Sequence, residues 1–166
     1  SAEDLQQARQ ATALPVLRKD FLLHDWEVYQ SRCWGADAIL LIAVALDDLR
    51  LAKMLELCRE VGLDALVEVH TPEEAVRVSR LAAPLVGINN RDLVSFAVDL
   101  AVTERILPLL SHDCLKISES GFETPEQLAR FPEVDAFLIG ETLVRTEDPT
   151  ECLKRLRGVQ SFAKDR

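Results

Sequence analysis

Short runs of apolar residues recur along the chain, and most of them end in a polar residue or a glycine. Such runs are typical of strands that are buried on both faces of a parallel sheet. The pattern predicts six strands, at Leu14–Arg18, Ala38–Ala43, Ala65–Val69, Leu85–Ile88, Leu115–Ser118 and Ala136–Ile139.

The segments between these runs carry helix signals. Thr71-Pro72 and Thr124-Pro125 each combine an N-cap threonine with proline at the first helical position, whereas Gly35 and Gly62 each follow an amphipathic stretch. Helices are therefore expected after the strands, among them those at 102–107 and 149–156, and a further helix is expected at 1–11.

Strands that alternate with helices predict parallel βα units. With no linker or low-complexity segment, residues 1–166 are expected to form a single α/β domain. The expected architecture is that of the (β/α)₈ TIM-barrel family, here as an incomplete barrel of about six units out of eight.

Six consecutive units would leave the strands at 14–18 and 136–139 with open edges. The barrel interior would also open to water, and we expect it to expose the core faces of Val16, Leu41, Val67 and Ile117. Open apolar edges favour association. The sequence therefore predicts self-association through these edges or rearrangement into a more open sheet. The alternative is a closed barrel completed by units outside these residues.

The composition of the chain limits the kinds of partner and the cellular compartment that we expect. The formal net charge of −9 argues against nucleic acid and anionic membranes as partners. No apolar run approaches the roughly 20 residues of a membrane span, and no signal-peptide pattern is seen. The four widely spaced cysteines are expected to be reduced and mostly buried in a cytoplasmic protein, and no metal site is predicted.

Lys19 and Glu68 are the strongest candidates for chemistry. Lys19 follows the first strand, at the end where βα barrels bind ligands, and can serve as a general acid, a Schiff-base amine or an anion anchor. Glu68 lies inside an apolar strand, where desolvation suits an acid–base role. The alternatives are a surface lysine and a structural salt bridge.

Three further strand tips can bind anions. Arg91 can hold a carboxylate or a phosphate, unless it simply pairs with Asp92 in its own loop. The two tips Ser118-Glu119-Ser120-Gly121 and Ile139-Gly140-Glu141-Thr142 each bring a glycine that lets backbone N–H groups approach a ligand. Adjacent loops late in a barrel often hold phosphate, so a small phosphorylated substrate is expected. His70, beyond the Glu68 strand, is expected to line the pocket.

These motifs together resemble those of the indole-3-glycerol phosphate synthase family, in its order and spacing. The resemblance covers essentially the whole chain and rests on Leu14–Phe21, Leu66–His70, Gly87–Leu93, Ile117–Gly121 and Phe137–Glu141. It implies a cofactor-free carboxy-lyase of tryptophan biosynthesis. Such an enzyme closes the indole ring of 1-(2-carboxyphenylamino)-1-deoxyribulose 5-phosphate with loss of carbon dioxide and water.

The resemblance also implies roles for individual residues. Lys19 would be the general acid and Glu68 the acid–base group of dehydration, with Asn89 and Glu119 orienting the substrate. Substrate and phosphate would be bound by Arg91, Ser120, Gly121, Gly140 and Glu141, and the apolar walls around the aromatic ring would be Phe21, Leu40 and Leu138.

One departure from the family pattern is clear. The family's Ser-Pro-Ser-Lys-Gly stretch, with a second lysine, is absent, as if the first two βα units were missing. This leaves two alternatives to an active synthase: a catalytically impaired fragment that only binds phosphate ligands, and another phosphate-binding barrel such as phosphoribosylanthranilate isomerase.

Overall fold

The computed structural model describes residues 1–158 and shows one parallel sheet of six strands, in the order β1-β2-β3-β4-β5-β6. The strands are β1 (Leu17–Arg18), β2 (Ala38–Ile42), β3 (Asp64–Val69), β4 (Leu85–Asn89), β5 (Leu115–Glu119) and β6 (Ala136–Leu138). Each strand pairs with the next along the chain. The six predicted strands and their parallel order are confirmed.

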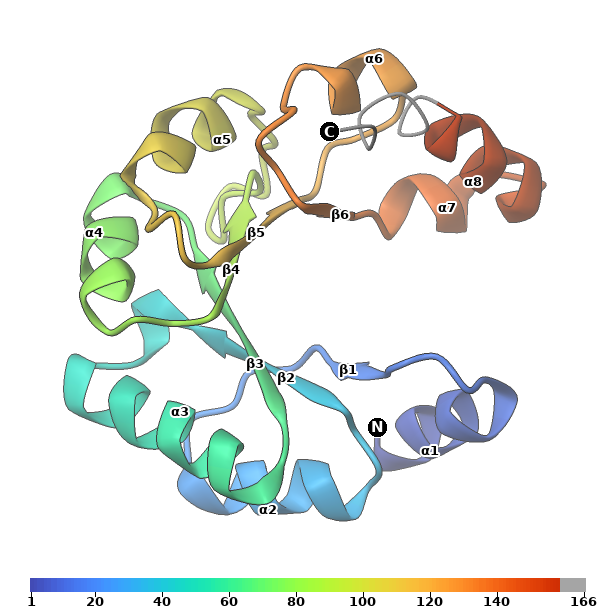
Figure 1. Ribbon diagram of the computed structural model, residues 1–166. Helices are drawn as coiled ribbons and strands as arrows, with labels where there is room; N and C mark the ends of the chain where they lie inside the picture. Colours follow the sequence, from blue (N-terminus) through green and yellow to red (C-terminus); the bar gives the residue numbers. More distant parts are fainter. Residues whose placement is uncertain (159–166) are drawn as a thin grey trace.

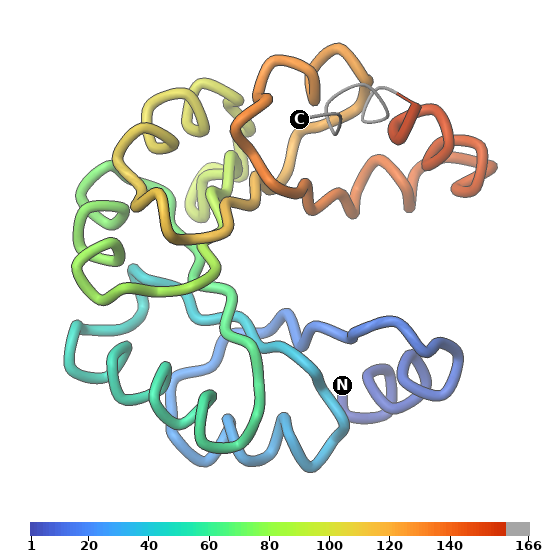
Figure 2. Tube along the Cα trace, in the orientation of Figure 1, coloured from blue at the N-terminus to red at the C-terminus, as the bar shows by residue number. Residues whose placement is uncertain are grey.

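The helices between consecutive strands lie on the outer side of the sheet, and further helices precede the first strand and follow the last (Figure 1). They are α1 (Ala2–Ala11), α2 (Asp25–Cys33), α3 (Asp48–Val61), α4 (Pro72–Arg80), α5 (Ala101–Ile106), α6 (Pro125–Ala129), α7 (Glu141–Arg145) and α8 (Pro149–Arg157), with short 3₁₀ turns η1 (Ala43–Ala45) and η2 (Leu107–Leu109). Figure 1 shows the strands as an arc that stays open between β1 and β6, with α1 at one end and α7 and α8 at the other. The tube in Figure 2 follows the same path from the blue N-terminus to the red α8. The fold is a half-barrel of the TIM-barrel type.

The predicted helix signals operate as expected. Asp47 accepts a hydrogen bond from the backbone N–H of Arg50 at the start of α3, and Gly62 ends that helix in the left-handed region at φ +70°. The threonine oxygens of Thr71 and Thr124 accept from the N–H groups of Glu74 and Gln127. These local signals place helix starts correctly because a cap needs only neighbouring residues.

The first strand is shorter than predicted. Pairing begins at Leu17, and Leu14, which we expected in the core, is 71% exposed. Pro15 has no N–H to donate, and the N–H of Val16 donates to the Asp37 carboxylate at 2.7 Å. β1 also has a partner strand on one side only.

The faces of the sheet also differ from expectation. Leu41 and Val67 are fully buried in the core cluster beneath the helices, and Val16 packs against the same cluster. Only Ile117 of the four residues expected on the inner face packs against the inner cluster. A strand buried on both sides is apolar throughout, so its sequence does not reveal which residues face inward.

The inner, concave face carries a second and smaller apolar cluster. Leu40, Ile42 and Leu66 form its buried part, and the residues packed against them are Leu17, Leu85, Leu93, Ile117 and Leu138. Because side chains alternate along a strand, Glu68 shares this inner face with Leu66. The half-barrel thus directs one carboxylate from β3 into its interior.

None of the helices within residues 1–158 is long and apolar enough to cross a membrane. The thiols of Cys58, Cys114 and Cys152 are buried, that of Cys33 is exposed, and none of the four is in a disulfide. The prediction that the cysteines are mostly buried is confirmed.

Candidate active site

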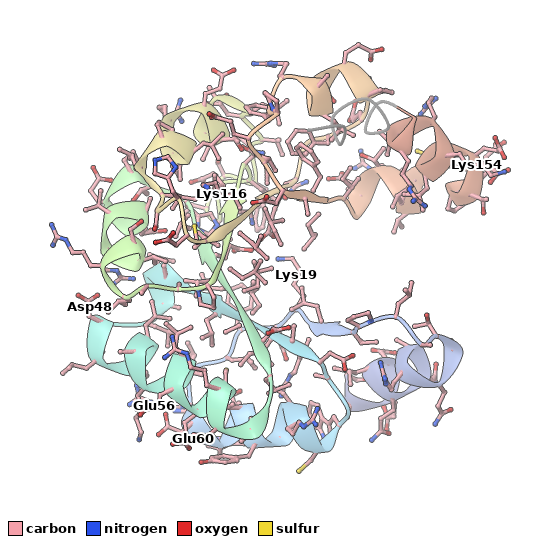
Figure 3. The ribbon with its side chains drawn as sticks, in the orientation of Figure 1. Lys19, Asp48, Glu56, Glu60, Lys116 and Lys154 are labelled. Carbon is pink, nitrogen blue, oxygen red and sulfur yellow. The ribbon has the colours of Figure 1, made fainter. Side chains whose placement is uncertain are left out.

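The tips of β1, β3 and β5 bring a lysine and two carboxylates together. Lys19 Nζ lies 2.9 Å from Glu68 Oε2 and 3.1 Å from Glu119 Oε2. Figure 3 shows Lys19 extending from β1 into the concave side of the sheet. The two carboxylates are almost completely buried, at 2% and 1% side-chain exposure, whereas the lysine side chain is 39% exposed. Only the lysine end of this cluster is open to a ligand from solvent.

Gly87, on the strand between the two carboxylates, makes the cluster possible. It pairs in register with Glu68 on β3 and with Ile117 on β5. A Cβ atom at this position would stand 2.0 Å from Glu119 Oε1 and 3.2 Å from Leu66 Cδ1. The Glu119 carboxylate therefore occupies the space that any other residue at position 87 would fill.

The pKa values of the two carboxyls are driven apart. Burial alone would raise the pKa of Glu68, but His70 and Lys19 outweigh it and lower that pKa to about 2. Burial raises the pKa of Glu119 to about 7, because Lys19 offsets the burial only in part and the charge of Glu68 adds to it. One cluster thus holds a permanent carboxylate beside a carboxyl that titrates near neutral pH.

Lys19 remains protonated in this environment. Burial lowers the pKa of its ammonium group, but the two carboxylates outweigh that effect and raise the pKa above its usual value. A charged ammonium can donate a proton to a developing oxyanion or hold an anionic group, but it is a poor nucleophile. The geometry therefore favours a general acid or an anion anchor over a Schiff-base amine in the resting state.

The side chain of Asn89, at the end of β4, is fixed by the loops that follow β4 and β5. Its Oδ1 accepts hydrogen bonds from Ser120 Oγ at 2.9 Å and from the backbone N–H of Arg91 at 3.0 Å. Asn89 therefore links two of the loops that were expected to bind substrate.

The neighbouring Asn90 was not singled out from the sequence. It is buried and donates to Ser118 Oγ and to the carbonyl oxygens of Glu119 and Ser120, while its Oδ1 accepts from Thr103. This network ties β4, β5 and α5 together directly under the site. A buried Asn-Ser-Thr set leaves no local pattern, so no sequence signal could have found it.

Arg91 pairs with Glu141, not with Asp92 as one alternative had it. Its guanidinium forms an ion pair with the Glu141 carboxylate, which also pairs with Arg145 at 2.6 Å. Asp92 instead accepts hydrogen bonds from Ser95 in its own turn. The partner is fifty residues away along the chain, so the sequence could not reveal it.

A cavity of about 670 Å³ opens beside the cluster, between the tips of β5 and β6. Its lining includes seven of the candidate residues: Lys19, Arg91, Ser120, Gly121, Leu138, Gly140 and Glu141. Arg145 and Thr142 of α7 also line it, and this short helix was missed in the sequence because it begins directly at the strand tip.

Backbone geometry shapes the cavity wall. Ser120 and Gly121 adopt φ +67° and +85°, and a Cβ at Gly121 would stand 2.3 Å from Val98 Cγ1. Left-handed backbone is tolerated by glycine and costs other residues about 1 kcal/mol or more. Glycine is therefore required at position 121, both for its left-handed backbone and because the Val98 side chain packs directly against it.

The other candidates lie around this cavity rather than on it. Glu68, Asn89 and Glu119 are buried beneath it, and Leu40 belongs to the inner apolar cluster. Phe21 lies two residues beyond Lys19 and is 63% exposed, so the structure does not bring it to the cavity. His70 is held between Glu68 and Glu74 instead of lining the cavity. Within residues 1–158 no group of side chains could hold a metal ion.

Solved structures with this fold are βα-barrel proteins. KGPDC from Streptococcus mutans aligns with a TM-score of 0.75 at 10% identity, over 96% of this chain and 78% of that one. The N-acetylmannosamine-6-phosphate 2-epimerase from Clostridium perfringens aligns with a TM-score of 0.68 at 16% identity, over 96% and 76%. At these identities the likeness establishes the fold class alone: an α/β protein of the barrel type, with its candidate site at the strand tips.

Sequence comparison identifies the family. The family model for indole-3-glycerol phosphate synthase matches residues 1–156. The synthase of Laribacter hongkongensis is 45% identical over 159 residues, and that of Variovorax paradoxus is 46% identical over 154 residues. This chain belongs to the indole-3-glycerol phosphate synthase family.

The matches cover unequal shares of the two proteins. They span 94% and 92% of this chain but only 60% and 58% of the relatives. This chain therefore corresponds to a little over half the length of the relatives it matches.

Proposed function

We propose that this chain carries the main catalytic half of an indole-3-glycerol phosphate synthase. The strongest support is Lys19, bound between the buried carboxylates Glu68 and Glu119 at the strand tips. The reaction would close the indole ring of 1-(2-carboxyphenylamino)-1-deoxyribulose 5-phosphate and release carbon dioxide and water, with no cofactor.

The cluster suits the proton movements of this reaction. Ring closure forms a carbon–carbon bond at the substrate ketone, whose oxygen must gain a proton, and the Lys19 ammonium can donate it. Loss of carbon dioxide restores the electron pair to the ring, and loss of water then completes the indole. Glu68, with its pKa lowered to about 2, stays a carboxylate that stabilises the Lys19 ammonium, whereas Glu119, with a pKa of about 7, can accept or release a proton.

The cavity suits the rest of the substrate. A phosphate can use the glycine-bearing turns at Gly121 and Gly140, with Arg91 and Arg145 as nearby cations. Leu138 and Leu40 offer apolar contacts for the aromatic ring, and Asn89 and Glu119 offer polar ones. Because Glu141 pairs with both arginines, an anionic ligand would have to displace it.

Turnover by two forms of the protein tests this function. The substrate should be incubated with the 166-residue chain, and with a chimera that joins this chain to the remaining part of the Laribacter relative, while indole fluorescence is followed. We expect the chimera to form the product and the chain alone to be slower. No product from a folded chimera would contradict the proposed function.

A phosphate-binding module without chemistry is the second candidate. The cavity between β5 and β6 supports it, because its lining includes the glycines Gly121 and Gly140 and the cations Arg91 and Arg145. Calorimetric titration of the chain with inorganic phosphate and with substrate separates the two. Binding of both ligands with no turnover in either form would favour this candidate.

We also propose that residues 1–166 form one partial-barrel domain that self-associates through its open edges. The edge strands β1 and β6 each lack a partner on one side within residues 1–158, and unpaired edges are hazards that proteins cover or pair. Light scattering at several concentrations should show dimers or larger species. A monodisperse monomer with cooperative unfolding would refute the edge-association part.

A cytoplasmic location is proposed as well. The support is the family and the four unpaired thiols, which suit a reducing compartment. The net charge of −9 argues against a nucleic-acid or anionic-membrane partner, while a local cationic cluster can still bind a small anion.

A further inference from the structure

His70 lies between two carboxylates, directly beyond the end of β3. Its Nε2 is 3.3 Å from Glu68 Oε1, and its Nδ1 is 3.7 Å from Glu74 Oε2. Glu74 is itself fixed, because the backbone N–H of His70 donates to its carboxylate at 2.8 Å. The imidazole is mostly buried and faces an acidic group with each of its ring nitrogens.

The arrangement makes the two catalytic carboxylates unequal. Glu68 meets a cation at each oxygen, Lys19 at Oε2 and His70 at Oε1. Within residues 1–158, Glu119 forms an ion pair with Lys19 alone. A buried carboxylate with one partner is far easier to protonate than one with two.

We propose that His70, oriented by Glu74, is a positioning residue that holds Glu68 as a carboxylate directed at Lys19, so that Glu119 is the carboxyl of the pair that carries a proton. The role of His70 in catalysis rests on the proposed function, whereas the charge state of Lys19, Glu68 and Glu119 does not.

The surrounding charges favour this state. The imidazole faces Glu68 from β3 and Glu74 from α4, and Asp92, in the loop after β4, interacts with it electrostatically. Arg77 of α4 acts on Glu74, while Lys19 and Glu119 act on Glu68 from β1 and β5. The anions around His70 therefore outnumber the cations.

The pKa of His70 follows these charges. Burial lowers it, but Glu68 and Glu74 outweigh the burial and raise it to about 9. Its stabilising effect is complete below about pH 6.5 and is lost as the pH rises through about 9. The lowered pKa of Glu68 has the opposite sign: its contribution is complete above about pH 4.5 and is lost as the pH falls through about 2.

Nitrogen NMR of the histidine side chains tests the charge state without any assay of activity. The chain should be labelled at histidine nitrogens and titrated from about pH 5 to 10, with His70→Gln used to assign the signals. We expect the His70 ring to stay an imidazolium beyond about pH 8. Glu68→Gln should lower its titration midpoint by at least about one unit, and Glu74→Gln should lower it by less, because the second contact is longer.

A matched control is Glu104→Gln, which removes a carboxylate that pairs with Arg130 on an exposed surface. This change should leave the His70 midpoint where it was. A His70 midpoint at or below about 6.5, or one that Glu68→Gln does not move, would overturn the proposal.

The pH profile of kcat/KM tests the positioning role of His70. It is measured on the chimera described above, which is the form expected to be active. His70→Gln should move the acidic limb to higher pH, since Glu68 without its second cation is protonated more readily. A merely structural role would lower the rate at every pH and leave the limb in place, and that result would reject positioning. Absence of activity in the parent would count against the proposed function alone, because the NMR titration still decides the state of His70.

Discussion

Replacing Lys19 with alanine should reduce turnover about a thousandfold, the usual scale of a lost general acid, with little loss of fold. Lys19 is the one group whose ammonium contacts both buried carboxylates within residues 1–158. Glu68 would keep His70 as a partner, and Glu119 would take up a proton, so no uncompensated buried charge would remain. Steady-state kinetics of the active form, with circular dichroism for the fold, measures the effect.

Two comparison variants make the Lys19 result specific. Lys154→Ala removes an exposed lysine that pairs with Glu151 on α8, at the far side of the molecule from Lys19 (Figure 3), and should leave turnover unchanged. Lys19→Arg keeps the positive charge, but a guanidinium does not give up a proton near neutral pH. If Lys19 is a general acid, the Lys19→Arg variant should be as inactive as Lys19→Ala. Near-normal turnover in Lys19→Ala would end the role assigned to Lys19, and recovery in Lys19→Arg would make it an anion anchor instead.

Replacing Gly87 with alanine should dislodge Glu119 and reduce turnover about a hundredfold. The new methyl group would stand 2.0 Å from Glu119 Oε1, so the carboxylate must move by about 1 Å or more and lose its position at Lys19. A shift of that size at a catalytic group can cost about 10²-fold in rate. Overpacking should also lower the free energy of unfolding by about 1–3 kcal/mol, as measured by denaturant titration.

A double-mutant cycle isolates the contact between position 87 and Glu119. In a Glu119→Ala background the clash is absent, and Gly87→Ala should then cost much less stability than it does alone. Gly62→Ala is the matched control, because a Cβ there meets nothing within 4 Å and only the φ of +70° is unfavourable. It should lower stability by about 1 kcal/mol without lowering turnover. Equal stability losses from Gly87→Ala in both backgrounds would show that Glu119 does not depend on Gly87.

The division of charge in the cluster has a further consequence for the reaction. Glu68 and Glu119 come from strands that flank the same glycine, yet one is held ionised and the other titrates near neutral pH. A pair of carboxyls with separated pKa values can supply a base and an acid at one pH. The proposed dehydration needs both, and the lysine between them couples their protonation.

The secondary-structure elements and their order could be predicted from the amino-acid sequence alone. Apolar runs, threonine-proline starts and glycine ends are local signals, and the six strands, their parallel order and the helix starts were predicted from them. Lys19 and Glu68 were also found locally, because a charge at the end of an apolar strand is visible without a fold. The family motifs then gave roles to Asn89 and Glu119, which lie at the ends of two further strands.

Other features needed the tertiary structure. Strands buried on both faces do not show which side is inner, so Leu41 and Val67 were placed on the wrong face. The pairing of Arg91 with Glu141 and the buried Asn90 network join segments that are distant in sequence.

The charge states of the site depended on the tertiary structure most of all. A pKa is set by burial and by the charges within a few ångströms, and three strands and α4 supply those charges. Glu68 and Glu119 look alike in the sequence, as glutamates near the ends of two predicted strands. Only the positions of Lys19, His70 and Gly87 around them make one a fixed anion and the other a group that exchanges protons near neutral pH.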